Sequence, residues 1–247
     1  MNINELNEEI KVCNKFRLSN TRMNSLRGEG NLNCRIMLIA QAPGENEDRD
    51  GKMFIGPSGR VLDELLNLAN VDRDEIYMTN LIKCMLPKCR KPKQDEIQMC
   101  SEYLDKEIEI INPEIIVPLG YYSTRYIFRK YNIPIPDRKI FYNVYGKIIW
   151  KEKKIYPIQH PASLLYNQTF RKDMEENYKK LKIFRKECKW YQICPMKRFY
   201  EEGIIERRWV ELYCKGDWEI CVRYQMEESG RYHEDNMLPD GSYLHYR

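Results

Sequence analysis

The stretch RIMLIAQAPGENEDRDGKMFIGPSG, residues 35–59, decides the fold. It opens with the apolar run RIMLIA (35–40), which has the length and composition of a buried β-strand. A loop rich in proline, glycine and acidic residues follows at 41–59. The apolar side chains of residues 60–70 then recur at helical spacing. A strand, a loop and a helix in this order predict one unit of an α/β sheet.

The same alternation of strands and helices continues toward the C-terminus. Further strands are predicted over 75–80, 114–120, 140–150 (a strand or hairpin) and 154–158, and further helices over 94–111, 121–130 and 170–185. Strands separated by helices favour a parallel sheet that is covered on both faces. We therefore expect a three-layer α/β/α sandwich around a short, mainly parallel four-stranded sheet. Ligands of such sheets bind beyond the carboxyl ends of the strands.

The C-terminal part of the chain differs from the rest in charge and in the spacing of its cysteines. Residues 187–247 hold nine Lys and Arg against twelve Asp and Glu, a net charge of −3, whereas residues 1–186 carry +7. We therefore expect a domain over 1–186 and a small Cys-rich metal-binding module over 187–247. A basic domain suits a polyanionic partner such as nucleic acid, although a solvated basic surface explains the charge equally well.

Composition excludes several classes of protein. Hydrophobic residues make up 43% of the 247 residues, which is enough for a core and excludes a disordered chain. No apolar run approaches the ~18 residues that a membrane helix needs. The N-terminal sequence MNINELNEEI is polar and acidic, unlike a secretory signal peptide. The expectation is a soluble, cytoplasmic protein with no membrane partner.

Three motifs carry a resemblance to a known family. They are IAQAPGENEDRDGKMFIGPSG (39–59), YMTNLIKC (77–84) and HPASLL (160–165). In this order they closely resemble the uracil-DNA glycosylase superfamily, and within it family 4, the iron–sulfur type; the resemblance covers about residues 13–184. It implies a DNA repair enzyme that hydrolyses the N-glycosidic bond of uracil, or of a related deaminated base, and leaves an abasic site.

The first motif departs from the family at one position. The family loop usually reads GEAPG, and Gln41 stands here in place of the carboxylate. The resemblance therefore implies that Gln41 and Ala42 contact the base or sugar and that Glu47 or Asp48 positions the attacking water. A related family, with the motif GQDPYH, excludes thymine with a tyrosine that falls at Gly44 here, so Glu47 is the candidate for excluding it. The alternative is that these acidic side chains only solvate the loop.

The remaining site residues follow from the same resemblance. Phe54 is expected to stack on the flipped base, and Asn80 to pair with the O4 and N3–H edge of uracil. His160 would donate to O2 as the base leaves as an anion. Leu164 and Leu165 would form a wedge that enters the duplex. The alternatives are that the two leucines and Phe54 pack in the core, and that Asn80 and His160 have an ordinary turn or loop role.

Five of the nine cysteines lie in the basic domain. Members of the family hold a 4Fe–4S cluster with four cysteines. The candidates for these four ligands in this chain are Cys13, Cys84, Cys89 and Cys100. Phe16 replaces the second cysteine of the family's N-terminal pair, so Cys89 is the proposed substitute. Cys34, at the entry to a strand, is expected to be a small buried residue. A damaged site that holds no cluster is the alternative.

The other four cysteines lie in the acidic module. They are Cys188, Cys194, Cys214 and Cys221. A segment of about 60 residues has little core of its own, so a bound metal would help it fold. Spacings of five and six residues and a Cys-Pro pair favour a second 4Fe–4S cluster over zinc, which prefers tighter pairs. Free buried thiols are the third interpretation.

Two other functions remain open. The missing carboxylate at Gln41 permits a non-catalytic binder of damaged or single-stranded nucleic acid. A glycosylase for another base, such as hypoxanthine, is the second. The expected partner in the leading interpretation is uracil-containing DNA, double- or single-stranded, and the acidic tail is where a protein partner would be expected.

Overall fold

The computed structural model describes residues 1–184 and 187–244, and the chain divides into two compact units, Met1–Lys180 and Leu181–Arg247. The domain boundary expected after residue 186 falls beside residues 185–186, which lie outside the described ranges. Each unit is described by itself.

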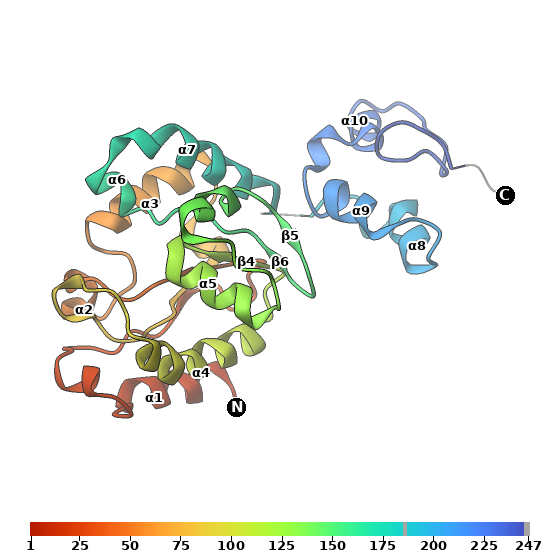
Figure 1. Cartoon of the computed structure of the whole chain (residues 1–247). Helices are drawn as coiled ribbons and strands as arrows, with labels where there is room; N and C mark the ends of the chain where they lie inside the picture. The colour runs from red at the N-terminus through yellow and green to blue at the C-terminus, as the bar shows by residue number, and fades with distance from the viewer. Residues whose placement is uncertain (185–186, 245–247) are drawn as a thin grey trace. The chain divides into compact units, whose positions relative to one another are not determined.

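A six-stranded sheet forms the centre of the first unit (Figure 1). In chain order its strands are β1 (Glu29–Gly30), β2 (Ile36–Ala40), β3 (Ile76–Asn80), β4 (Ile115–Pro118), β5 (Ile149–Trp150) and β6 (Lys154–Ile155). The order across the sheet is β1-β3-β2-β4-β6-β5. The four inner strands are parallel, and the two-residue strands β1 and β5 run antiparallel at the edges. The expected parallel sheet of four strands is therefore confirmed and is widened by two short edge strands.

The strand register brings three loops to one end of the sheet. Ala40, the last residue of β2, pairs with Asn80, the last residue of β3. Leu119, just past β4, forms a parallel bridge with Ile158. Parallel strands present their carboxyl ends at the same edge. The loops that begin at Gln41, at Leu81 and at Gln159 therefore start side by side.

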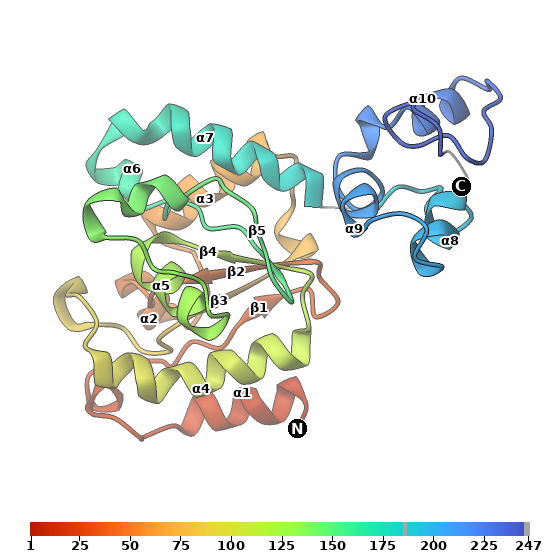
Figure 2. The ribbon, with the colours of Figure 1, turned by 45° about the vertical axis from the view of Figure 1, so that its right-hand side comes forward.

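Helices cover both faces of this sheet. Their bounds are α1 (Ile3–Val12), α2 (Glu45–Asp50), α3 (Pro57–Leu68), α4 (Gln94–Ile111), α5 (Gly120–Lys130), α6 (Ser163–Tyr166) and α7 (Arg171–Lys179), with short 3-10 turns at Arg17–Asn20, Arg73–Glu75, Pro87–Cys89, Arg138–Val144, Gln168–Phe170 and Lys180–Phe184. Figure 2 shows α3, α6 and α7 on one side of the strands and α1, α4 and α5 on the other. This is the expected three-layer α/β/α arrangement.

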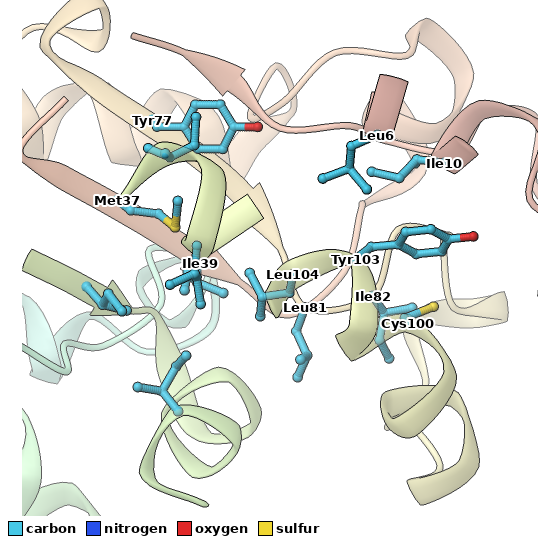
Figure 3. Packing of buried hydrophobic residues seen from close by; sticks show 14 of the residues in the cluster. Leu6, Ile10, Met37, Ile39, Tyr77, Leu81, Ile82, Cys100, Tyr103 and Leu104 are labelled. Carbon is cyan, nitrogen blue, oxygen red and sulfur yellow. The ribbon is translucent and has the colours of Figure 1, made fainter. Parts of the chain in front are cut away.

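The core on the α1 and α4 side explains why these helices form where they do. Leu6 and Ile10 of α1 face Leu104 of α4 and are fully buried (Figure 3). Their spacing places them on one side of a helix. Cys100 of α4 belongs to the same cluster of buried side chains, near Ile82. The core therefore extends to two of the cysteines proposed as metal ligands, Cys84 and Cys100.

Two local predictions were wrong. The strand or hairpin predicted over 140–150 is wrong in its first half, where residues 138–144 form 3-10 turns, whereas β5 at its end does form an antiparallel hairpin with β6. The Asp137 side chain accepts from the backbone N–H of Lys139 and stabilises that turn. The acidic part of the 41–59 loop forms helix α2, whose first turn holds three acidic residues and which ends at Gly51 in the left-handed conformation, with φ of 68°. Acidic side chains stabilise a helix N-terminus, which favours this short helix.

The second unit is built from short helices around a core of its own. These are α8 (Pro195–Glu201), α9 (Arg207–Trp209), a π-helical turn (Val210–Cys214), a 3-10 turn (Trp218–Ile220) and α10 (Val222–Glu228). Cys188 and Cys214 are part of that core, with Met196, Phe199 and Val210. In both units, none of the helices within the described ranges combines the length and hydrophobicity needed to cross a bilayer.

Candidate active site

A small pocket lies at the carboxyl end of the sheet and brings the three motifs together. Its volume is about 30 Å³, and a wider cavity of about 610 Å³ shares part of its lining. The predicted residues that line the small pocket are Ala42, Glu47, Phe54, Asn80 and His160. Ala42, Glu47 and Phe54 come from the segment after β2, Asn80 is the last residue of β3, and His160 lies beyond β6. The parallel register of β3, β2, β4 and β6 brings these distant parts of the sequence to one end of the sheet.

Phe54 is held in an unusual backbone conformation, with φ of 51°. Arg73 donates from its guanidinium to the carbonyl oxygens of Phe54, at 2.8 Å, and Met53, at 3.3 Å, and pairs with Asp63. A Cβ on Gly59 would lie 1.8 Å from the Phe54 carbonyl oxygen, so only glycine fits there. Left-handed φ is costly for a bulky residue, and these contacts maintain it. The sequence contained no signal for the role of Arg73, which is 19 residues from Phe54.

Asn80 closes the pocket from the end of β3. Its side chain is 2% exposed, and Nδ2 donates to Sδ of Met53 at 3.0 Å. An amide carries both a donor and an acceptor, so the same side chain can pair with the O4 and N3–H edge of a base. Met53 is a pocket residue that the motifs did not point to.

His160 faces Phe54 across the pocket, with ring centroids 6.0 Å apart and planes inclined by 30°. The backbone N–H of Ala162 donates to its Nδ1 at 3.1 Å. Burial lowers the pKa of His160 to about 4. Gly120, with φ of +78°, allows the close approach, because a Cβ there would lie 3.2 Å from the Cβ of His160. The ring is therefore neutral near pH 7 and is fixed in orientation.

The two acidic candidates of α2 have different surroundings. The Glu47 carboxylate lines the pocket and accepts from the backbone N–H of Gly56 at 2.7 Å. Asp48 is 3% exposed, and its carboxylate accepts from the backbone N–H groups of Met23 and Asn24. Asp48 anchors another loop and does not line the pocket. Glu47, which lines the pocket, is therefore the candidate that we carry forward for positioning the attacking water.

Glu47 also fills the space above Gly44. A Cβ placed on Gly44 would lie 2.5 Å from Oε2 of Glu47. A side chain at position 44 and the Glu47 carboxylate therefore compete for the same volume. This is the position at which the GQDPYH family carries its blocking tyrosine.

The other predicted residues surround the wider cavity. Gln41 is half-buried and lines it beside His160. Leu165 is 47% exposed and Tyr166 88% exposed at its rim. Leu164, by contrast, is 1% exposed. Its side chain belongs to the core, so the wedge predicted there was wrong for Leu164, and Leu165 and Tyr166 are the exposed pair.

Three cysteines of the first unit lie in the same neighbourhood. The thiols of Cys84 and Cys100 interact electrostatically with each other and with Cys13. Burial is the main cause that raises the pKa of Cys100 to about 11, and that of Cys84 above its usual value. Arg22 donates from Nη1 to Sγ of Cys84 at 2.9 Å, which places a positive charge beside the group.

Cys89 and Cys34 lie elsewhere. Cys89 is exposed on the loop between Cys84 and Cys100 and lines the wider cavity. Lys88 and Cys89 both have positive φ, of 55° and 51°. Cys34 is buried, with the backbone of Tyr77 beside its thiol. The predicted cluster ligands are thus three neighbouring thiols and one exposed loop thiol.

The cysteines of the second unit lie around a single cavity, with Cys188, Cys214 and Cys221 buried and Cys194 half-buried. Across residues 1–184 and 187–244, no set of three or more His, Cys, Asp or Glu side chains is arranged so that it could hold a single metal ion.

Comparison with known proteins agrees with this geometry. The family model described as "Uracil DNA glycosylase superfamily" matches residues 27–182. The chain is 42% identical over 189 residues to the type-4 uracil-DNA glycosylase of Saccharolobus solfataricus, which covers 73% of this chain and 85% of that protein. It is 36% identical over 185 residues to the type-4 enzyme of Thermotoga maritima, covering 73% of this chain and 93% of that protein.

Proposed function

Because the chain belongs to the uracil-DNA glycosylase superfamily, we propose that it removes uracil from DNA by hydrolysing the N-glycosidic bond, which leaves an abasic site. The observation that carries this proposal is the placement of Phe54, Asn80 and His160 around one pocket. A stacking ring, an amide and a histidine are the groups that a flipped uracil requires. The net charge of +7 on residues 1–186 suits a DNA partner.

Binding of the base would use the aromatic ring and the amide. Phe54 stacks on the flipped uracil, a contact worth about 1–3 kcal/mol. The Asn80 amide donates to O4 and accepts from N3–H, and cytosine presents the opposite pattern at these positions. The Glu47 carboxylate, which fills the space above Gly44, leaves no room for the 5-methyl group of thymine. Gln41 contacts the base or sugar at the cavity wall.

Bond cleavage would use His160 and Glu47. The C1′–N1 bond breaks and its electron pair leaves with the base, whose negative charge develops on O2. Since Nδ1 of His160 accepts from Ala162, Nε2 carries the proton and donates it as a hydrogen bond to O2. Water adds to C1′ as Glu47 orients it and accepts its proton. The uracil anion is then protonated by solvent.

We further propose that Cys13, Cys84, Cys89 and Cys100 hold a 4Fe–4S cluster, as the resemblance to the iron–sulfur type implies. Three of these thiols lie near one another, which supports the proposal. Cys89 becomes the fourth ligand when its exposed loop moves toward the other three thiols. The positive φ of Lys88 and Cys89 strains this loop, and the movement would relieve that strain. When bound, the cluster cross-links this loop, which also carries basic residues suited to phosphate contact, including Lys88 and Arg90.

The test of the proposed activity is base release. A labelled uracil oligonucleotide, single- or double-stranded, is incubated with the protein and then cleaved with alkali at abasic sites. Asn80→Ala should slow excision tens- to several-hundred-fold, because unpaired polar base atoms cost about 2–4 kcal/mol. Asn33→Ala, an exposed asparagine before the amino end of β2, is the matched control and should not change the rate.

Three results would redirect the assignment. Excision by Asn80→Ala at the wild-type rate would contradict the role of Asn80. DNA binding without any cleavage would favour the non-catalytic binder. Release of hypoxanthine in preference to uracil would favour the other glycosylase.

A further inference from the structure

The four cysteines of the C-terminal unit lie outside everything that the family explains. The family match ends at residue 182, and these cysteines begin at 188. The family therefore lends no support to a second metal centre. Any role for these thiols has to be argued from their own surroundings.

All four thiols lie close together. Each of the six pairs among Cys188, Cys194, Cys214 and Cys221 is near enough for the two thiols to interact electrostatically. The four also line one cavity of about 830 Å³. The backbone N–H of Cys188 donates to the carbonyl of Cys214 at 2.7 Å, which ties two distant segments together at this point. Four segments of the chain thus meet at one place through their cysteines.

Backbone N–H groups lie close to two of the sulfur atoms in the same way. Those of Trp190 and Tyr191 lie near the thiol of Cys188, and those of Arg223 and Tyr224 lie near the thiol of Cys221. In both cases they belong to the second and third residues after the cysteine. N–H dipoles placed in this way favour a sulfur that carries negative charge, as a metal-bound thiolate does.

Arg223 adds an independent observation. It is 3% exposed, lines the same cavity, and interacts electrostatically with Cys214 and Cys221. Its Nη1 donates to the carbonyls of Glu234, Asp235 and Met237, whereas its buried Nε has no hydrogen-bond partner within the described residues. A buried donor without a partner is rare and indicates a missing acceptor. An anionic group between the thiols would supply one.

We propose that Cys188, Cys194, Cys214 and Cys221 bind a 4Fe–4S cluster that organises the C-terminal unit. Each thiol loses its proton and bonds to one iron of the cluster, so four protons are released and no electron is transferred in the binding step. The proposal does not depend on the glycosylase activity.

The separations of five and six residues within the two cysteine pairs favour a cluster over a single zinc ion, which prefers tighter pairs. Zinc binds thiolates at about 2.3 Å, so four sulfur atoms around it lie within about 4 Å of one another. In the described part of the chain no group of side chains meets the requirement for one ion. These four thiols instead surround a cavity, which suits a larger group with four separate iron atoms.

The experiment compares full-length variants that are purified anaerobically. Cys194→Ser combined with Cys221→Ser should contain about four fewer iron atoms and four fewer acid-labile sulfides per chain than the wild type. Cys34→Ser, which removes a buried cysteine outside both groups, should lose none. The loss is measured against the wild type, so the result is the same whether or not the first unit holds a cluster, and uracil excision is not part of the readout.

A second measurement does not depend on how the variants fold. In the wild type, the four thiols should resist alkylation, read by mass spectrometry, until the iron is removed by oxidation and chelation, and should react afterwards. Equal alkylation before and after iron removal would overturn the proposal. Unchanged iron in the double variant, or the loss of one zinc with iron unchanged, would overturn it too.

Discussion

The backbone N–H of Ala162 donates to Nδ1 of His160 across 3.1 Å, and this contact decides which ring nitrogen carries the proton. Since Nδ1 accepts, the neutral ring is protonated at Nε2. Burial lowers the pKa of the ring to about 4, well below its ordinary value of 6.5. The departing base would therefore meet a neutral donor rather than an imidazolium ion.

The neutral, buried ring of His160 predicts how the excision rate and the stability of the fold depend on pH. The single-turnover rate should show no inflection from His160 between pH 5 and 8, and the imidazole signal of His160 should titrate near pH 4 by NMR. The same lowered pKa determines whether the fold gains or loses stability as the pH changes. Between pH 4 and 6.5 the unfolded chain binds more protons here than the folded one, so stability falls as the pH is lowered through this window. A rate inflection near 6.5 that disappears in His160→Ala would contradict the assignment.

Glu47 has two proposed roles that two substitutions separate. Glu47→Gln keeps the size of the side chain and its acceptor for Gly56 but removes the charge, so uracil excision should slow by about a hundredfold or more. Glu47→Ala loses the same charge and also opens the space above Gly44, so the ratio of thymine to uracil excision should rise in this variant and stay unchanged in Glu47→Gln. Both rates are read on matched uracil and thymine oligonucleotides.

The exposed Glu45 of the same helix supplies the control. Glu45→Gln should leave both rates unchanged. A wild-type uracil rate in Glu47→Gln would show that Glu47 does not activate water. An unchanged ratio of thymine to uracil excision in Glu47→Ala would place the exclusion of the methyl group on another side chain.

Arg73 is expected to act through Phe54. Arg73→Ala removes the donors to the carbonyls of Met53 and Phe54, so excision should fall by about tenfold. The decisive readout is a double-mutant cycle, because the effect of Arg73→Ala should largely vanish in the Phe54→Ala background. Arg60→Ala, an exposed arginine of α3, is the control. Additive losses in the double variant would mean that Arg73 supports the fold and not the ring.

The cysteines of the first unit make a separate prediction. Cys89→Ser should remove about four iron atoms per chain, since Phe16 cannot supply a fourth thiolate. Cys34→Ser should keep them, because Cys34 lies beside Tyr77 and apart from the other thiols. Iron content and visible absorption provide the measurement. Full iron in Cys89→Ser would show that another group completes the site.

The sequence motifs predicted the pocket residues well where their position follows from the ends of strands. Asn80 is the last residue of β3, and the segments that carry Phe54 and His160 follow β2 and β6 at the same edge of the sheet, so the parallel strands bring them together. The interior strands are continuous apolar runs, which made the sheet itself predictable.

Orientation within the short helices could not be predicted. Neighbouring residues of a helix point about 100° apart, so one of Glu47 and Asp48 reaches the pocket and the other does not. The same holds for Leu164 and Leu165 in α6. Without the tertiary contacts of Asp48 with Met23 and Asn24, the sequence gives no means of choosing between adjacent residues. Arg73 was missed because its contacts are with backbone atoms, which leave no motif.

The two-residue strands β1 and β5 have a consequence for solubility in the crowded cell. An open sheet edge is a template on which another chain can add a strand, and long flat edges lead to aggregation. Here both edges are only two residues long, and β1 contains Gly30 with φ of +117°. An edge this short and bent gives a second chain few backbone groups with which to pair. The long apolar strands that position the pocket are all interior, so the segments most prone to self-association are the ones that the sheet shields.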